Sequence, residues 1–209
     1  MPPPADAAPE LILEPIQIEH VPATHTVHVA VFRDVTNAAF LHEQLLGRNA
    51  AFEYALIDAS SVVSRLHVLA AAYKAVSALL AGALRTPNVH SEIVCALSPN
   101  NNISEAYRRF GVTPATRHLV VVKVLVAPSA LTPDAVRAHL RAHVAGVPVP
   151  FADAALRGSG GAPGLADWPK VRRYYKLNGI RWLDDLADAD ARAAETEALV
   201  LGAMALRGL

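Results

Sequence analysis

The stretch HLVVVKVLV at residues 118–126 decides the fold expected for this chain. Its β-branched valines favour a pleated sheet, and Lys123 is its one lysine or arginine. The stretch therefore predicts the most buried strand of the protein. Upstream, residues 28–35 (HVAVFRDV) alternate and are rich in β-branched side chains, which predicts a second, half-buried strand.

Apolar runs predict two further strands, at residues 52–57 and 91–97. Capping residues, glycines and prolines delimit the helices between and after the strands. The expected helices span residues 38–46, 62–80, 104–110, 170–177 and 186–206, with one more that begins at Thr132. This order predicts a single α/β (α+β) domain in which helices flank a small sheet of about four strands. The connections allow either parallel or antiparallel neighbours.

The helix expected at residues 62–80 carries an apolar stripe with alternating spacings of four and three residues. The stripe consists of Val62, Leu66, Leu69, Tyr73, Val76 and Leu80. We expect this stripe to face the core. The alanines of the same helix keep it thin, so that a sheet or a second helix can approach it closely.

The domain organisation follows from length and composition. At 209 residues the chain is long enough for one sizeable core. Its proline-rich start predicts a disordered leader and linker over residues 1–24, followed by one globular domain over residues 25–209. Glycines and prolines at residues 147–169 predict a flexible loop within that domain. No apolar run reaches the roughly 20 residues of a membrane span, so we expect a soluble protein without a membrane partner.

The charges and the cysteine content restrict the possible partners and compartments. The 19 basic and 19 acidic residues balance, which argues against holding nucleic acid by bulk charge. Any nucleic-acid role must therefore be local and needs help from partner subunits. Cys95 is the only cysteine, so the chain cannot form an internal disulfide, and a lone thiol in an apolar stretch suits a reducing compartment.

The sequence offers no positive sign of catalysis. The glycine-rich residues 158–164 lack the Gly-Lys-Ser/Thr ending of a phosphate loop. His139 and His143 are four residues apart and could share a metal, but no third ligand is evident. Cys95 has the apolar neighbours of a packed thiol rather than of a nucleophile. We expect a protein that is not an enzyme, with no catalytic residue, metal or cofactor.

Two polar stretches could contact nucleic acid. Residues 97–102 (LSPNNN) precede a helix N-terminus, and amides with free backbone N–H groups suit single-stranded bases and phosphates. A turn that satisfies its own backbone has the same composition. Residues 170–182 (KVRRYYKLNGIRW) interleave cations with aromatics, as phosphate-gripping and base-stacking segments do. A helix that buries its apolar face and leaves its cations in solvent also explains this pattern.

Three segments resemble the CGI/TPRKB family of PRPK-binding proteins, which are subunits of the KEOPS/EKC complex. They are residues 62–76 (VVSRLHVLAAAYKAV), 85–110 (RTPNVHSEIVCALSPNNNISEAYRRF) and 200–208 (VLGAMALRG). The SPNNNI block is the most specific part, and the last segment is similar to fungal members. The resemblance runs from about residue 27 to the end and is weakest at residues 147–169.

The resemblance implies a small antiparallel sheet flanked by helices and a non-catalytic role. It implies direct binding of the kinase-like ATPase subunit of KEOPS, indirect association with the other subunits, and binding of the 3′ CCA end of tRNA. The complex installs threonylcarbamoyl on an adenosine beside the anticodon. The family also implies a location in nucleus and cytoplasm, with a link to telomere maintenance.

The matched motifs assign candidate residues. The candidate tRNA contacts are Ser98, Pro99, Asn100, Asn101, Asn102 and Ile103, with Lys74 and Arg85 as nearby cations. The candidate kinase contacts are Leu199, Leu201, Gly202, Met204 and Leu206. The alternative is a pure protein-binding adaptor that activates or stabilises the kinase-like subunit without touching RNA.

Overall fold

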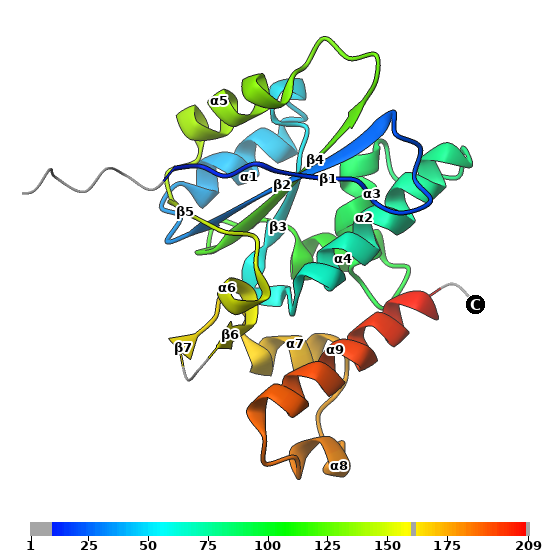
Figure 1. Cartoon of the computed structure of the whole chain (residues 1–209), viewed down its shortest axis with the longest axis vertical. Coiled ribbons are helices and arrows are strands. Elements are labelled where there is room, and N and C mark those ends of the chain that lie inside the picture. The colour runs from blue at the N-terminus through cyan, green and yellow to red at the C-terminus, as the bar shows by residue number, and fades with distance from the viewer. Residues whose placement is uncertain (1–9, 160–161, 208–209) are drawn as a thin grey trace, which may run out of the picture.

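The computed structural model describes residues 10–159 and 162–207, which form an open five-stranded sheet with helices on both faces (Figure 1). The strands of this sheet are β1 (Glu14–Ile16), β2 (His25–Arg33), β3 (Ala55–Asp58), β4 (Leu119–Val126) and β5 (Val147–Val149). All paired strands are antiparallel, in the order β1-β2-β4-β3, with β5 also beside β2. The expected small antiparallel sheet flanked by helices is therefore confirmed.

The helices lie in two layers. The α-helices are α1 (Ala38–Leu46), α2 (Arg65–Leu80), α3 (Val89–Ala96), α4 (Ile103–Phe110), α5 (Pro133–His143), α6 (Asp153–Arg157), α7 (Trp168–Tyr174), α8 (Arg181–Asp184) and α9 (Ala189–Ala205). Helices α1 and α5 cover one face of the sheet, and α2, α3 and α4 cover the other (Figure 1). Helices α6 to α9 gather at the end of the molecule away from α5. None of the helices in the described ranges has the length and apolar character of a membrane span.

Strand β2 explains why the core has two parts. Its side chains alternate, so that Val27, Val29 and Val31 join a larger core with α2, α3, α7 and α9. Ala30 and Phe32 point the other way, into a smaller core with α1 and α5. Because β2 and its partner β4 are buried on both faces, their sequences are almost continuously apolar.

The segment predicted as a strand at residues 91–97 is helical instead and belongs largely to α3. Asn88 caps this helix, since its side chain accepts a hydrogen bond from the backbone N–H of Ser91 at 2.8 Å. Every residue of α3 except Ser91 is buried. A helix buried all round has a continuous apolar run, which periodicity cannot distinguish from a buried strand. The prediction of a strand here is wrong for that reason.

Only part of the stripe predicted over residues 62–80 is buried: Val62 and Val76 are in the core, and Leu69 packs partly against it. The buried residues of helix α2 are His67, Val68, Ala71, Ala72, Ala75 and Val76. Leu66, Tyr73 and Leu80 of the predicted stripe are instead 52%, 43% and 47% exposed. Small side chains on the buried face let α2 lie close to α3, which leaves the larger apolar side chains outside.

Two segments predicted to lack structure are ordered where the structure describes them. Residues 10–24 include β1, and Leu11 and Leu13 are each only 4% exposed in the smaller core. Within residues 147–169, β5 joins the main sheet, α6 follows, and β6 (Gly158–Ser159) pairs with β7 (Ala162–Pro163). Residues 1–9 of the expected leader and residues 160–161 of the expected loop lie outside the described ranges.

A buried chain of hydrogen bonds joins three of the helical segments. The backbone N–H of Val63 donates to His67 Nδ1 at 3.3 Å, so the proton is on Nε2, which donates to Tyr175 Oη at 2.9 Å. The Tyr175 hydroxyl in turn donates to the carbonyl of Leu97. This chain ties α2, the end of α7 and the end of α3 together, and burial lowers the pKa of His67 to about 3.

Buried neutral histidines make the stability of the fold depend on pH. Burial, with Lys123 nearby, also lowers the pKa of His90 to about 3. A histidine in the unfolded chain has a pKa of about 6.5, so the unfolded state binds more protons as the pH falls below that value. The free energy of unfolding should therefore decrease between about pH 6.5 and 3, and His67 and His90 each contribute about 2 kcal/mol of that loss at pH 5.

The test is to replace His67 by glutamine and measure urea unfolding at pH 7 and pH 5. His67→Gln should remove the contribution of His67 to the change in the free energy of unfolding between pH 7 and pH 5, even if the variant is also less stable at pH 7. His20→Gln is the matched control, because the His20 side chain is 79% exposed. An unchanged pH dependence in His67→Gln would show that His67 does not remain neutral in the folded state.

Candidate nucleic-acid interface

The amide-rich turn at residues 97–102 connects α3 to α4. Asn102 caps α4, because its Oδ1 accepts the backbone N–H of Glu105 at 3.0 Å. Asn100 Oδ1 accepts the backbone N–H of Asn102 at 3.0 Å, and Asn100 Nδ2 donates to the Glu105 carboxylate at 2.8 Å. Asn100 and Asn102 thus hold the turn in shape. Their side chains satisfy the backbone of the turn itself, as the composition also allowed.

The predicted tRNA contacts of this turn differ in exposure. Ser98 is fully buried, and its hydroxyl accepts the backbone N–H of Asn100 at 3.3 Å. A contact through the Ser98 side chain therefore does not fit the structure. Asn101 and Asn102 are exposed, and Ile103 is 41% exposed. The outward surface of the turn is consequently formed by residues 101–103.

Asn101 brings two arginines together from distant parts of the chain. Its Oδ1 accepts hydrogen bonds from the guanidinium of Arg85 at 2.7 Å and from Arg207 Nε at 3.0 Å. Arg207 also donates to the carbonyl of Cys95 at the end of α3. Arg207 follows α9 and was not among the predicted RNA contacts, although it lies in the C-terminal segment that carried the family resemblance.

Lys74 completes a group of three cations, which we call the cation cluster: Lys74, Arg85 and Arg207. Lys74 Nζ donates to the carbonyl of Met204 at 2.8 Å, at the C-terminal end of α9. Burial lowers the pKa of Lys74, and the charges of Arg207 and Arg85 lower it further. Like charges held this close repel one another, so an anion beside the cluster would be stabilised.

Glu92 fixes the position of Arg85. One oxygen of this buried carboxylate accepts the backbone N–H groups of Arg85 and Thr86, each at 3.0 Å, and the Thr86 hydroxyl at 2.8 Å. The same residue lies in the first turn of α3, where the helix dipole favours a negative charge. The backbone of the loop before α3 is therefore held rigidly beside the turn.

A groove of about 820 Å³ opens next to the cation cluster. It is lined by residues from 42–54, 85–91 and 103–114, including Arg85 and Ile103. Arg48 and Arg108 also line it, and neither takes part in an ion pair among the described residues. Apolar Leu46 and half-buried Tyr107 lie on the same lining. Cations beside apolar and aromatic surface are the combination that single-stranded nucleic acid uses.

The predicted kinase contacts on α9 are divided between core and surface. Met204 is 3% exposed and packs in the protein's own core, so a direct contact through its side chain does not fit the structure. Leu199 and Leu201 pack partly against that core, while Leu206 is 66% exposed. A side chain at Gly202 would meet nothing within 4 Å, so the outside of α9 is open there.

The exposed face of α2 carries three large apolar side chains. Leu66, Tyr73 and Leu80 recur at every seventh position, which puts them along one side of the helix. We call these three residues the outer α2 face. The sequence contains this pattern, but apolar periodicity alone does not say whether a stripe faces the core or a partner.

The other predicted sites have structural roles. In the basic stretch, Val171, Tyr175 and Leu177 are buried, so the predicted burial of the apolar face is confirmed. Lys170 and Arg172 are not left in solvent as expected, because they pair with Asp58 and Asp184. Burial raises the pKa of Cys95 to about 11, as expected of a packed thiol. Among the described residues, no group of three or more His, Cys, Asp or Glu side chains could hold a metal ion.

Comparison with known proteins gives consistent matches along the chain. The family model described as "Kinase binding protein CGI-121" matches residues 32–208. The EKC/KEOPS complex subunit CGI121 of Gibberella zeae is 54% identical over 203 residues, which cover 95% of this chain and all of that protein. The subunit of the same name from Neurospora crassa is 47% identical over 213 residues. That of Schizosaccharomyces pombe is 32% identical over 182 residues, 87% of this chain and 93% of that protein.

The role of Glu92 can be tested through stability. Glu92→Ala leaves the backbone N–H groups of Arg85 and Thr86 without their acceptor, while the Thr86 hydroxyl can still donate to the carbonyl of Asn88. The change should lower the free energy of unfolding by about 1 to 3 kcal/mol. Glu195→Ala, at an exposed position of α9, is the control and should change it by less than about 0.5 kcal/mol. Urea unfolding at pH 7 measures both. Equal stability of the two variants would contradict the role assigned to Glu92.

Proposed function

The chain belongs to the CGI-121 family of kinase-binding proteins, and from this premise we propose a scaffold function with two binding surfaces. In this proposal it is a non-catalytic subunit of an EKC/KEOPS complex. One surface binds the kinase-like ATPase subunit of that complex, and the other binds the 3′ CCA end of tRNA. The subunit would thereby support the threonylcarbamoyladenosine modification of tRNA.

The observation that carries the RNA part is the cation cluster beside the groove. The whole chain has balanced charge, so long-range attraction does not explain RNA binding. The cluster instead concentrates positive charge where the exposed Asn101 offers an amide and the groove offers apolar and aromatic surface. A single-stranded end can place its phosphates on the cations and its bases in the groove, because its bases are neither paired nor held in a stack as they are in a duplex.

The kinase part is supported by the family description and by the outer α2 face. Three large apolar side chains along one helix are unusual on a surface that meets only water. The open side of α9 at Gly202 and the exposed Leu206 extend the candidate surface, because α9 packs against α2. The alternative function, a pure adaptor without RNA contact, needs this surface alone.

The cellular location is part of the same proposal. A subunit that works on tRNA within this complex would occur in nucleus and cytoplasm, and at chromosome ends if the complex acts in telomere maintenance. The other subunits of the complex would be reached through the kinase-like partner.

The RNA surface can be tested with paired tRNAs. Arg85→Ala and Arg108→Ala should each weaken binding of intact tRNA and scarcely affect tRNA that lacks its CCA end. Each lost phosphate contact should also reduce the slope of log affinity against log salt by about 0.7. Arg33→Ala is the control, since its side chain is 54% exposed on β2, away from the groove. Unchanged binding of both tRNAs would favour the pure adaptor, and equal losses for the two would place the RNA contact outside the CCA end.

The kinase surface can be tested by co-purification with the kinase-like subunit. Tyr73→Asp puts a charge into the proposed interface and should weaken binding by about 2 kcal/mol or more, as hot-spot changes do. Leu131→Asp is the matched control, because Leu131 is similarly exposed at 39% in the segment before α5. Circular dichroism checks the folding of both variants. If the folded Tyr73→Asp variant still bound the kinase-like subunit, the docking surface would not be the outer α2 face.

A further inference from the structure

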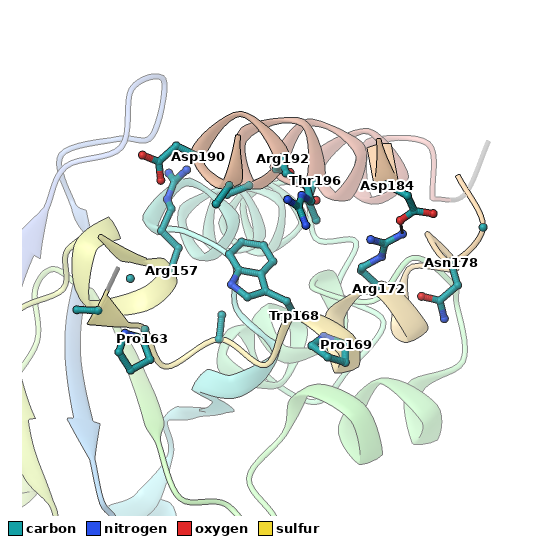
Figure 2. Close-up of a pocket in the computed structure, with 17 residues that line it drawn as sticks. Arg157, Pro163, Trp168, Pro169, Arg172, Asn178, Asp184, Asp190, Arg192 and Thr196 are labelled. Carbon is teal, nitrogen blue, oxygen red and sulfur yellow. Dashed lines mark hydrogen bonds and ion pairs between the residues drawn. The ribbon is translucent and has the colours of Figure 1, made fainter. Parts of the chain in front are cut away.

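A second cavity lies away from the groove and the cation cluster. It has a volume of about 770 Å³ and lies between the end of α6, the β6–β7 hairpin, α7, α8 and the first half of α9 (Figure 2). None of the predicted tRNA or kinase contacts lines it. Its volume is within the range of sites for small molecules.

Three arginines from three helices line this cavity: Arg157 of α6, Arg172 of α7 and Arg192 of α9. In each, the Nε–H group is buried and has no hydrogen-bond partner among the described residues. Buried donors without acceptors are unfavourable, so a ligand would have to be bound through the terminal nitrogens of these guanidinium groups. Guanidinium groups bind phosphate oxygens with particularly strong hydrogen bonds.

The acidic neighbours show which arginine is available to a ligand. Arg157 pairs with Asp153 at 2.7 Å and Glu197 at 3.3 Å, and Arg172 pairs with Asp184. None of the ion pairs in the described part of the chain involves Arg192. Four carboxylates, Asp153, Asp184, Asp190 and Glu197, lie at or beside the lining, and they offset the charges of Arg157 and Arg172. Arg192 is therefore the lining arginine that remains for an anionic group of a ligand.

Trp168 indicates the other half of the ligand. Figure 2 shows its indole in the middle of the cavity lining, between Arg157 and the pair formed by Arg192 and Thr196. The ring is half-buried and packs partly against the core. Indole rings stack on flat heteroaromatic rings, and the amide of Asn178 can hydrogen-bond to their polar edges.

We propose that this cavity binds a nucleotide, with its phosphate at Arg192 and its base on Trp168. The chemistry of one phosphate and one planar base is shared by a free mononucleotide and by a nucleotide of an RNA strand. The inference goes beyond the proposed tRNA and kinase surfaces, because it uses none of their residues.

The test uses Trp168 as its own reporter. The chain has two tryptophans, and the other, Trp182, is 52% exposed on α8. In the Trp182→Phe protein, adenosine monophosphate should change the remaining fluorescence in a saturable way. Adenosine lacks the phosphate and inorganic phosphate lacks the base, so each should bind at least about tenfold more weakly than adenosine monophosphate. No saturable change with adenosine monophosphate up to millimolar concentrations would overturn the proposal.

Two variants assign the site. In the same background, Arg192→Ala should raise the dissociation constant about tenfold, which corresponds to about 1.4 kcal/mol. Arg181→Ala, an exposed arginine of α8 outside the cavity, should leave it unchanged. Arg192→Gln serves as a second variant if circular dichroism shows that Arg192→Ala is misfolded. Binding that is insensitive to both changes at Arg192 would overturn the proposal.

A competition experiment distinguishes a free mononucleotide from a nucleotide of an RNA strand as the ligand. A short RNA oligonucleotide that displaces adenosine monophosphate from the Arg181→Ala protein would support the site and assign it to a nucleotide of RNA. Binding of adenosine monophosphate that the oligonucleotide does not displace would support the site and assign it to a free nucleotide. The loss of tRNA binding in Arg85→Ala is measured independently, so failure of either proposal is recognised separately.

Discussion

The hydrogen-bonded chain from His67 through Tyr175 to the carbonyl of Leu97 is the constraint on which the functional half of the molecule depends. Its groups are buried, so each needs its partner, and loss of any one leaves a polar atom unpaired in the core. Leu97 is the residue at which α3 ends and the amide-rich turn begins. The position of the turn relative to α2 and α7 is therefore fixed from inside the protein.

The balanced composition conceals an uneven distribution of charge. Acidic residues concentrate around α8 and the start of α9, where Asp184, Asp185, Asp188 and Asp190 lie. The cation cluster lies at the opposite end of α9, and the α-helix dipole makes its carbonyl end attractive to Lys74. Local anion sites can thus exist on a chain whose formal net charge is zero.

Helix α2 links packing to binding. Alanines on its inner face allow close contact with α3, and this leaves Leu66, Tyr73 and Leu80 for the outside. Lys74, on the same helix, binds the end of α9 and belongs to the cation cluster. The two proposed surfaces are consequently neighbours on one rigid element, so a partner bound to α2 would lie close to RNA bound at the cluster.

The sequence alone determined those features that local patterns encode. It specified the central strand at β4, the helix α1, the capped helices α4 and α5, and the turn that Asn102 closes, because caps, turns and strand periodicity involve residues close in sequence. Only the tertiary structure decided the rest. It showed that α3 is a buried helix, that the outer α2 face is exposed, and that Arg207 reaches Asn101 across 106 positions. Such features depend on which surfaces meet when the chain folds, and no local pattern records that choice.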